Sequence, residues 1–295
     1  MVATTDNVIR LYDSRTGTPL KHLLAQKYGI RSVCFTHHPQ CIVYASSKFE
    51  NAKQPEDNHA IRYHSLFDNA FIRYFKVSLR PSPFSATESA FRYHIRFRGF
   101  FSLSLLCFFF LFLSLSLFVV CIALHAFMQG HVNDVTNVQM SKCSDCFYSA
   151  SKDKTVKKWD LRVDRQSGSM EVGSMGETIL VAVDNQENLL AVGVVGGGIK
   201  LYSAREMEKG FFHEIIGPKH QVMENIHCLK FSNDANMVAV SFRNEIALYD
   251  ISIEATSKAN QTNNPKYIFR KASEDSEFNE RLEFCFTPDD KFILR

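Results

Sequence analysis

Residues 130–160 read GHVNDVTNVQMSKCSDCFYSASKDKTVKKWD, and this stretch decides the fold. It contains three segments rich in β-branched and aromatic residues, at 135–138, 147–151 and 155–159, separated by short polar turns. Segments of this length and composition are typical of β-strands. The stretch therefore predicts consecutive strands joined by tight turns, the last of them ending at Trp159-Asp160.

The ending of this stretch recurs along the chain. Five segments finish with two or three β-formers, a basic or small residue, an aromatic residue and then Asp or Ser. They are 7–13 (NVIRLYD), 60–65 (AIRYHS), 155–160 (TVKKWD), 198–203 (GIKLYS) and 245–250 (EIALYD). Their last residues are 52, 95, 43 and 47 positions apart. Removing the 53 residues 77–129 shortens the long step to 42, within the ~40–45 residue period of a four-stranded propeller blade.

The composition allows a sizeable core and excludes some partners. The chain has 295 residues, of which 45% are hydrophobic, and its net charge is only +3. A nucleic acid is therefore not the obvious partner. The eight cysteines are scattered, and residues 1–15 are too polar for a secretory leader. These features predict free thiols in a reducing compartment.

Residues 77–129 differ from the rest of the chain and are interpreted as an apolar insert outside the repeats. The segment holds eleven of the 26 Phe residues and carries a net charge of +3, equal to that of the whole chain. Residues 99–127 have no charged side chain and are dense in Phe, Leu and Ser. Either a real structural element or a mistranslated segment would produce such a break in the period.

Three hypotheses account for this insert. Its core, 105–124, is long enough to span a bilayer, although a span would separate repeats that must pair in one fold. A long inter-blade loop this apolar would bind lipid or aggregate. A translated intron is the preferred hypothesis. Val77 and Gln129 fit the usual intron boundaries, Phe, Leu and Ser codons are pyrimidine-rich, and excision joins Lys76 to Gly130.

The stretch 130–160 resembles a WD repeat, because the family's Gly-His, Ser-x-x-x-Asp and Trp-Asp elements occur in order at the expected spacing. The resemblance implies an all-β fold, a WD40-repeat β-propeller. It also implies a buried structural tetrad, in which His131, Ser149, Asp153 and Trp159 hydrogen-bond and tie the strands of a blade together. The other four copies lack most of these residues, so their internal bonding is left open.

Further segments look like the small WD-repeat subunit of the COMPASS histone H3 lysine-4 methyltransferase complex. They are 61–66, 68–76, 159–162, 229–233 and 286–289. The resemblance implies a non-catalytic scaffold in the nucleus that acts in chromatin and transcription regulation. Its partners would be protein subunits of that complex, and also protein phosphatase or RNA polymerase II factors. No cofactor, no membrane and no sequence-specific nucleic acid is implied.

The repeats predict an incomplete propeller. The family's ring has seven blades, whereas the residues outside the insert suffice for about five to six blades. We expect three parts: residues 1–76 as the first blades, truncated at the N-terminus; 77–129 as the insert; and 130–295 as the remaining blades, truncated at the C-terminus. An unclosed ring would leave strand edges exposed.

Other motifs favour structural roles. Cys143 and Cys146 have zinc-knuckle spacing, but a second pair of ligands is missing nearby, so a turn between strands is expected. Four further motifs are expected in turns or loops: glycines 196–198, His37-His38, Asp289-Asp290 and the glycosylation-like triplet 260–262. No metal site is predicted.

No arrangement of Ser, His, Asp or Cys suggests catalysis, so we expect neither an enzyme nor catalytic or cofactor-binding residues. Two rival functions stay open. One is an adaptor of another complex, such as a ubiquitin ligase receptor or a phosphatase-linked termination factor. The other is a protein anchored in a membrane through residues 99–127.

Overall fold

The computed structural model describes residues 2–3, 7–25, 28–47, 59–76, 130–163, 165–173, 179–215, 226–242, 245–251, 265–270 and 283–294. Residues 1–76 and 131–295 form one unit. The predicted insert 77–129 and the triplet 260–262 lie outside the described residues, so the hypotheses about them stay predictions. Within the described part of the chain, no helix is long and apolar enough to cross a membrane.

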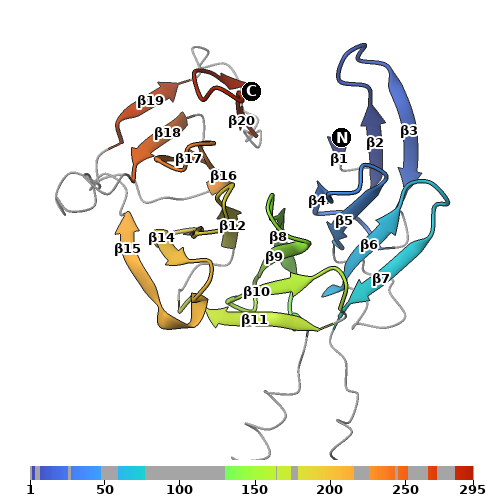
Figure 1. The fold of residues 1–295 in the computed structure, drawn as a ribbon, viewed down its shortest axis with the longest axis horizontal. Helices are drawn as coiled ribbons and strands as arrows, with labels where there is room; N and C mark the ends of the chain where they lie inside the picture. Colours follow the sequence, from blue (N-terminus) through green and yellow to red (C-terminus); the bar gives the residue numbers. More distant parts are fainter. Residues whose placement is uncertain are drawn as a thin grey trace, which may run out of the picture. The chain divides into compact units, whose positions relative to one another are not determined.

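The described chain is built of antiparallel sheets that follow one another in chain order (Figure 1). The first sheet has three strands, β1 (Val2–Ala3), β2 (Val8–Tyr12) and β3 (Pro19–Leu24). The second has four, β4 (Ser32–Phe35), β5 (Cys41–Ala45), β6 (Ile61–Ser65) and β7 (Phe71–Phe75). The third also has four, β8 (Val135–Met140), β9 (Cys146–Ser151), β10 (Thr155–Asp160) and β11 (Gln166–Glu171).

Two further four-stranded sheets and a strand pair complete the order. The fourth sheet contains β12 (Ile179–Val183), β13 (Leu189–Val194), β14 (Gly198–Ser203) and β15 (Phe211–Ile215), with the 3-10 helix η3 (Met207–Lys209) before its last strand. The fifth contains β16 (Ile226–Phe231), β17 (Met237–Phe242), β18 (Glu245–Asp250) and β19 (Tyr267–Arg270). Strands β20 (Cys285–Phe286) and β21 (Ile293–Leu294) form the last pair.

The cores lie between consecutive sheets, one core for each pair of neighbours. Ile9 and Leu23 pack on Tyr44 between the first and second sheets. Equivalent clusters join the second sheet to the third, the third to the fourth, the fourth to the fifth, and the fifth to the β20–β21 pair. Each inner sheet is therefore covered on both faces, which explains why β5 and β12 are apolar and buried along their whole length.

A β-bulge marks the repeated aromatic position in most sheets. The register between the third and fourth strands of a four-stranded sheet shifts just before His64, Trp159 and Tyr202, and the same shift precedes Tyr12 in the first sheet. A bulge adds one residue to a strand and increases its local twist. The recurring sequence ending thus encodes a recurring backbone irregularity as well as a strand.

The predicted fold is confirmed. The five recurring endings form β2, β6, β10, β14 and β18, and the four-stranded antiparallel sheets are those of WD40 blades. Neighbouring sheets contact through their first strands, β4 with β8, β8 with β12, and β12 with β16 (Figure 1). Among the described residues, none of the core clusters joins β1–β3 to β20–β21, so the sheets do not close on themselves.

Candidate functional site

The four predicted tetrad residues come from one sheet and lie together. His131 precedes β8, Ser149 is in β9, Asp153 is in the turn after β9, and Trp159 is in β10. Cross-strand pairing sets Trp159 beside Phe147, and Ser149 beside Lys157 two residues away on the same strands. His131, Ser149 and Trp159 are at most 1% exposed. The sheet thus brings all four polar groups into a largely water-free position.

The hydrogen bonds form one directed chain. The Trp159 indole N–H donates to the Ser149 hydroxyl oxygen at 2.7 Å, and this hydroxyl lies 2.6 Å from His131 Nε2. His131 Nδ1 lies 2.9 Å from Asp153 Oδ2. Because indole can only donate, the consistent arrangement has the Ser149 hydroxyl donating to Nε2 and the Nδ1–H donating to Asp153. Every side-chain polar atom of the four tetrad residues then has a hydrogen-bond partner.

Burial and nearby hydrogen-bond donors determine the ionisation of His131 and Asp153 in the tetrad. Burial lowers the pKa of His131 below its usual value, and this effect exceeds the opposing influence of Asp153. For Asp153, burial acts to raise the pKa, but donors from His131, Thr155 and the Val132 backbone N–H outweigh it and lower the pKa. At neutral pH the arrangement is thus a neutral imidazole beside a carboxylate, held by hydrogen bonds.

The other sheets replace the tetrad with apolar or aromatic residues. Strand register places Tyr44, Val192 and Val240 at the position that Ser149 occupies. The aromatic position is held by His64, Tyr202 and Tyr249 in the corresponding sheets. His64 bonds Asn69 at 3.1 Å instead, and the buried Tyr249 hydroxyl has no hydrogen-bond partner among the described residues. These three sheets therefore lack the serine and the tryptophan of the network, and in the second sheet the buried Arg62 guanidinium donates to the Ser46 hydroxyl instead.

The remaining sequence motifs lie in turns. Cys143 precedes β9 in a turn and donates to the Asn185 carbonyl at 2.7 Å, and all six described cysteines are free thiols. In the described ranges, no group of three His, Cys, Asp or Glu residues could hold a metal ion. Gly196, in the turn between β13 and β14, and Gly198, the first residue of β14, have φ angles of +80° and +99°, a conformation that favours glycine.

A belt of contacts between first turns was not predicted. From the second sheet onward, the turn between the first two strands of a sheet contacts the equivalent turn of the next sheet. His37 Nε2 lies 2.9 Å from the Ser144 carbonyl, and the Asn185 amide donates to the Asn233 carbonyl at 3.0 Å. The Asn233 backbone N–H in turn donates to Asp290 Oδ1 at 2.9 Å. These bonds run through successive sheets at one end of their strands.

Glu187 is the most heavily bonded acidic residue of this belt among the described residues. Its carboxylate accepts from Ser141, Ser144 and Tyr148 at 2.6–2.9 Å, and Lys158 forms an ion pair with it at 2.6 Å. All four partners belong to the preceding sheet. Burial acts to raise the pKa of Glu187, yet the donors, Lys158 foremost, lower it to about 2.

A recurring turn pattern could have revealed this belt. Glu187 and Asp290 occupy the fourth position of turns that open at Asp184 and Thr287, and both have a left-handed φ, +56° and +55°. The sequence signal in these two turns is an Asp or Thr followed three residues later by an acidic residue. It is short, and it does not identify the partners.

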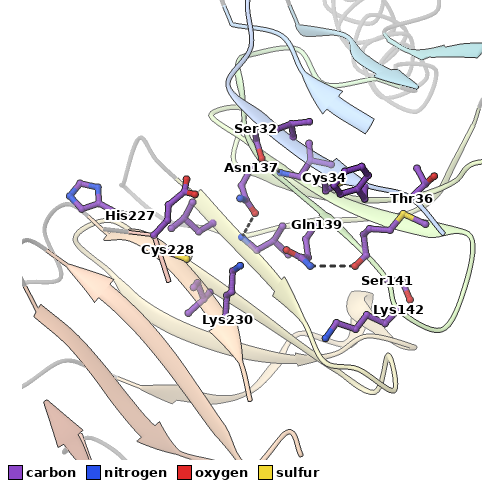
Figure 2. A pocket seen from close by; sticks show the side chains of 18 of the residues that line it. Ser32, Cys34, Thr36, Asn137, Gln139, Ser141, Lys142, His227, Cys228 and Lys230 are labelled. Carbon is purple, nitrogen blue, oxygen red and sulfur yellow. Dashed lines mark hydrogen bonds between the residues drawn. The ribbon is translucent and has the colours of Figure 1, made fainter. Parts of the chain in front are cut away.

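A cavity of about 520 Å³ lies between the first strands of four sheets. Its lining comes from β4, β8, β12 and β16 with their adjoining turns (Figure 2), and from Glu283 ahead of β20. Polar side chains predominate among the labelled residues, including Asn137, Gln139, Lys142 and Lys230. Sequence reasoning did not assign these residues, because Lys230 lies in β16, about 90 positions after Asn137, Gln139 and Lys142 in and after β8, and only the fold brings them together.

Comparisons with known proteins agree with this geometry. A family described as "WD domain, G-beta repeat" matches residues 122–160. The chain is 26% identical to Protein ANTHESIS POMOTING FACTOR 1 of Arabidopsis thaliana over all of this chain and 67% of that protein. It is 24% identical to Set1 complex component swd2 of Schizosaccharomyces pombe, over all of this chain and 64% of that protein.

A third relative extends the similarity to animals. WD repeat-containing protein 82 of Drosophila melanogaster is 24% identical over 98% of this chain and 68% of that protein. The chain thus spans about two thirds of the length of these relatives. The chain thus combines WD40-type sheets with one matched WD repeat, and it is similar along its whole length to relatives that include a Set1 complex component.

Proposed function

We propose that this protein is a non-catalytic scaffold subunit of a COMPASS-type histone H3 lysine-4 methyltransferase complex in the nucleus. The observation that carries the proposal is the similarity over the whole chain to a protein named as a Set1 complex component. The geometry supports a non-catalytic role, because the polar groups of the tetrad hydrogen-bond to one another and hold the strands together. None of them is left exposed as a reactive group. A scaffold of this kind binds through its turns and loops.

The structural role of the tetrad is part of this proposal. His131, Ser149, Asp153 and Trp159 satisfy one another, so a network of this kind stabilises and orients a blade without supplying a nucleophile or a base. The first-turn belt adds bonds between sheets at one end of the strands. Together they would hold the binding surface in a fixed arrangement.

Affinity purification tests the proposal. The full chain carrying a small tag is expressed at its natural level and recovered from nuclear extract, and its partners are identified by mass spectrometry. We expect subunits of a Set1-type methyltransferase, with the tag alone as the control. Recovery of ubiquitin ligase subunits, or of phosphatase and polymerase factors without any methyltransferase subunit, would assign the scaffold to another complex and contradict the proposal.

A further inference from the structure

The central cavity, defined as the space lined by β4, β8, β12 and β16, their adjoining turns and Glu283 ahead of β20, has the features of a binding site. Its volume of about 520 Å³ falls within the ~300–1,000 Å³ that is usual for ligand pockets. Figure 2 shows the side chains of Lys142 and Lys230, from the third and fifth sheets, both extending into this space. Residues more than 80 positions apart in the sequence thus face one region.

Hydrogen bonds to the protein backbone fix the orientation of two amide side chains in the cavity, Asn137 and Gln139. The Asn137 side-chain oxygen accepts from the Val181 backbone N–H at 3.2 Å, which leaves its NH₂ group to donate (Figure 2). The Gln139 NH₂ group donates to the Met140 carbonyl at 3.3 Å, which leaves its oxygen to accept. Both amides are therefore oriented before any ligand arrives, and this reduces the ordering cost of binding.

The charged groups of the cavity are unbalanced. Lys142 and Lys230 are opposed by Glu283, the single acidic side chain among the described lining residues. No salt bridge of the described residues joins Glu283 to either lysine. Lys142 reaches only Asn233 Oδ1, at 3.5 Å, and Lys230, which is half-buried, has no hydrogen-bond acceptor within the ranges that the structure describes. The described lining residues are thus rich in hydrogen-bond donors and carry a net positive charge.

We propose that the central cavity binds an acidic peptide segment of a partner protein, with a Glu or Asp carboxylate of that segment held by Lys230 and the Asn137 NH₂ group. The Gln139 oxygen accepts a backbone N–H of the same segment, and Lys142 at the rim attracts the ligand. A carboxylate fits better than a phosphate, because no Arg side chain is among the described residues that line the cavity, and dianionic phosphates are usually held by guanidinium forks or clustered backbone N–H groups.

This inference rests on the proposed function only in taking its ligand from a partner protein. Purification from nuclear extract tests which complex the chain joins, whereas peptide titration of the isolated chain tests the cavity. Either proposal can therefore fail alone.

The test uses the full chain and three fluorescently labelled tetrapeptides, measured by fluorescence anisotropy. One has two central glutamates flanked by alanines, the second has glutamines in their place, and the third has phosphoserines. We expect the glutamate peptide to bind and the glutamine peptide to bind at least about tenfold more weakly, because a charge-assisted hydrogen bond is replaced by a neutral one.

Variants locate the site. Lys230→Gln is expected to weaken binding of the glutamate peptide about tenfold, and Lys142→Gln two- to threefold, since exposed charges contribute less. Lys209→Gln is the matched control, because Lys209 is exposed on η3 and pairs with Glu206 away from the cavity lining. Asn137→Asp is a second cavity variant, which keeps the acceptor for Val181 while adding a repelling charge.

Three results would overturn the proposal. The first is equal affinity for the glutamate and glutamine peptides, or binding of neither. The second is unchanged affinity in both Asn137→Asp and Lys230→Gln relative to Lys209→Gln. The third is binding of the phosphoserine peptide more than tenfold tighter than that of the glutamate peptide, which would assign the cavity to a phosphorylated ligand. The fluorescence of Trp159 confirms that each variant is folded, because it is the single Trp of the chain.

Discussion

Ser149 connects two buried ring nitrogens, so its hydroxyl group contributes more than one hydrogen bond. It accepts from Trp159 and donates to His131, and all three side chains are almost fully buried. Removing the oxygen leaves an indole N–H and an imidazole nitrogen without partners. A buried group left in this way costs about 1–3 kcal/mol.

We therefore expect Ser149→Ala to lower the free energy of unfolding by about 2–4 kcal/mol. Urea unfolding followed by Trp159 fluorescence measures the change. Ser167→Ala is the matched control, because Ser167 is exposed in β11 of the same sheet and donates only to the Lys158 carbonyl; its effect should stay within about 0.5 kcal/mol. Equal effects of the two substitutions would contradict a structural role of the tetrad.

The ionisation of His131 predicts sensitivity to mild acid. Its pKa is lower in the folded protein than in the unfolded chain, so the unfolded chain binds the proton more tightly. The contribution of neutral His131 to the free energy of unfolding is fully present above about pH 6.5. It is lost as the pH falls below that value, by up to about 1.4 kcal/mol per pH unit. The lowered pKa of Asp153 adds a further loss only below about pH 4.

The measurement is the free energy of unfolding at several pH values between about 5 and 7.5. The expected result is a fall toward pH 5 that is smaller in the His131→Asn variant, whose side chain does not titrate. A residual slope is expected in this variant, because the pKa of His64 is also lowered by burial. Identical slopes in the two proteins would show that His131 is not a source of the pH dependence.

At the scale of strands and turns, the sequence predicts features that depend on neighbouring residues in the chain, such as the positions of the strands. The five endings were recognisable because each combines β-formers with an aromatic residue at a fixed position, and all five are strands. Their bulges were not predicted, since a register shift depends on the partner strand. The partners of Glu187 lie 29–46 residues before it, and no periodicity in the sequence points to them.

Glu187 gives the prediction at this scale. Glu187→Gln removes the charge that Lys158, Ser144 and Tyr148 share, and charge-assisted hydrogen bonds contribute about 1.5–3 kcal/mol. We expect the interface between the third and fourth sheets to loosen, with faster amide hydrogen exchange in β9 and β12 and a stability loss of that order. The control is Glu206→Gln, whose ion pair with Lys209 is exposed. If amide hydrogen exchange in the Glu187→Gln variant became faster only at the tip of the turn that holds residue 187, Glu187 would not stabilise the interface between the third and fourth sheets.

At the scale of the molecule, the two sheets that flank residues 77–129 pack directly on each other. Phe75, at the end of β7, lies 4.9 Å from Phe147 and 5.5 Å from Trp159, measured between ring centroids. The Arg73 guanidinium donates to the Leu161 carbonyl at 2.6 Å, and the Val138 backbone N–H donates to Ser32 Oγ at 3.1 Å. This interface is completed by residues on either side of the segment.

We therefore predict that deleting residues 77–129, with Lys76 joined to Gly130, leaves the propeller sheets intact. The core between the second and third sheets is built from residues 43–75 and 135–161, so the deletion removes none of its members. Trp159 should keep the same emission maximum and the same urea midpoint, and less protein should aggregate, because a long apolar stretch is gone. As a control, deleting the 16 residues 61–76 removes Phe75 and Ile61 and should abolish the transition.

The same deletion bears on the three interpretations of the segment. Sequencing of transcripts across the junction shows whether mature messages lack its 159 nucleotides, as a translated intron requires. If every transcript retains them and the deleted protein fails to fold, the segment is part of the fold and the predicted division into 1–76, 77–129 and 130–295 is wrong. If every transcript retains them and the deleted protein folds, the segment is a genuine insertion whose function is separate from the propeller.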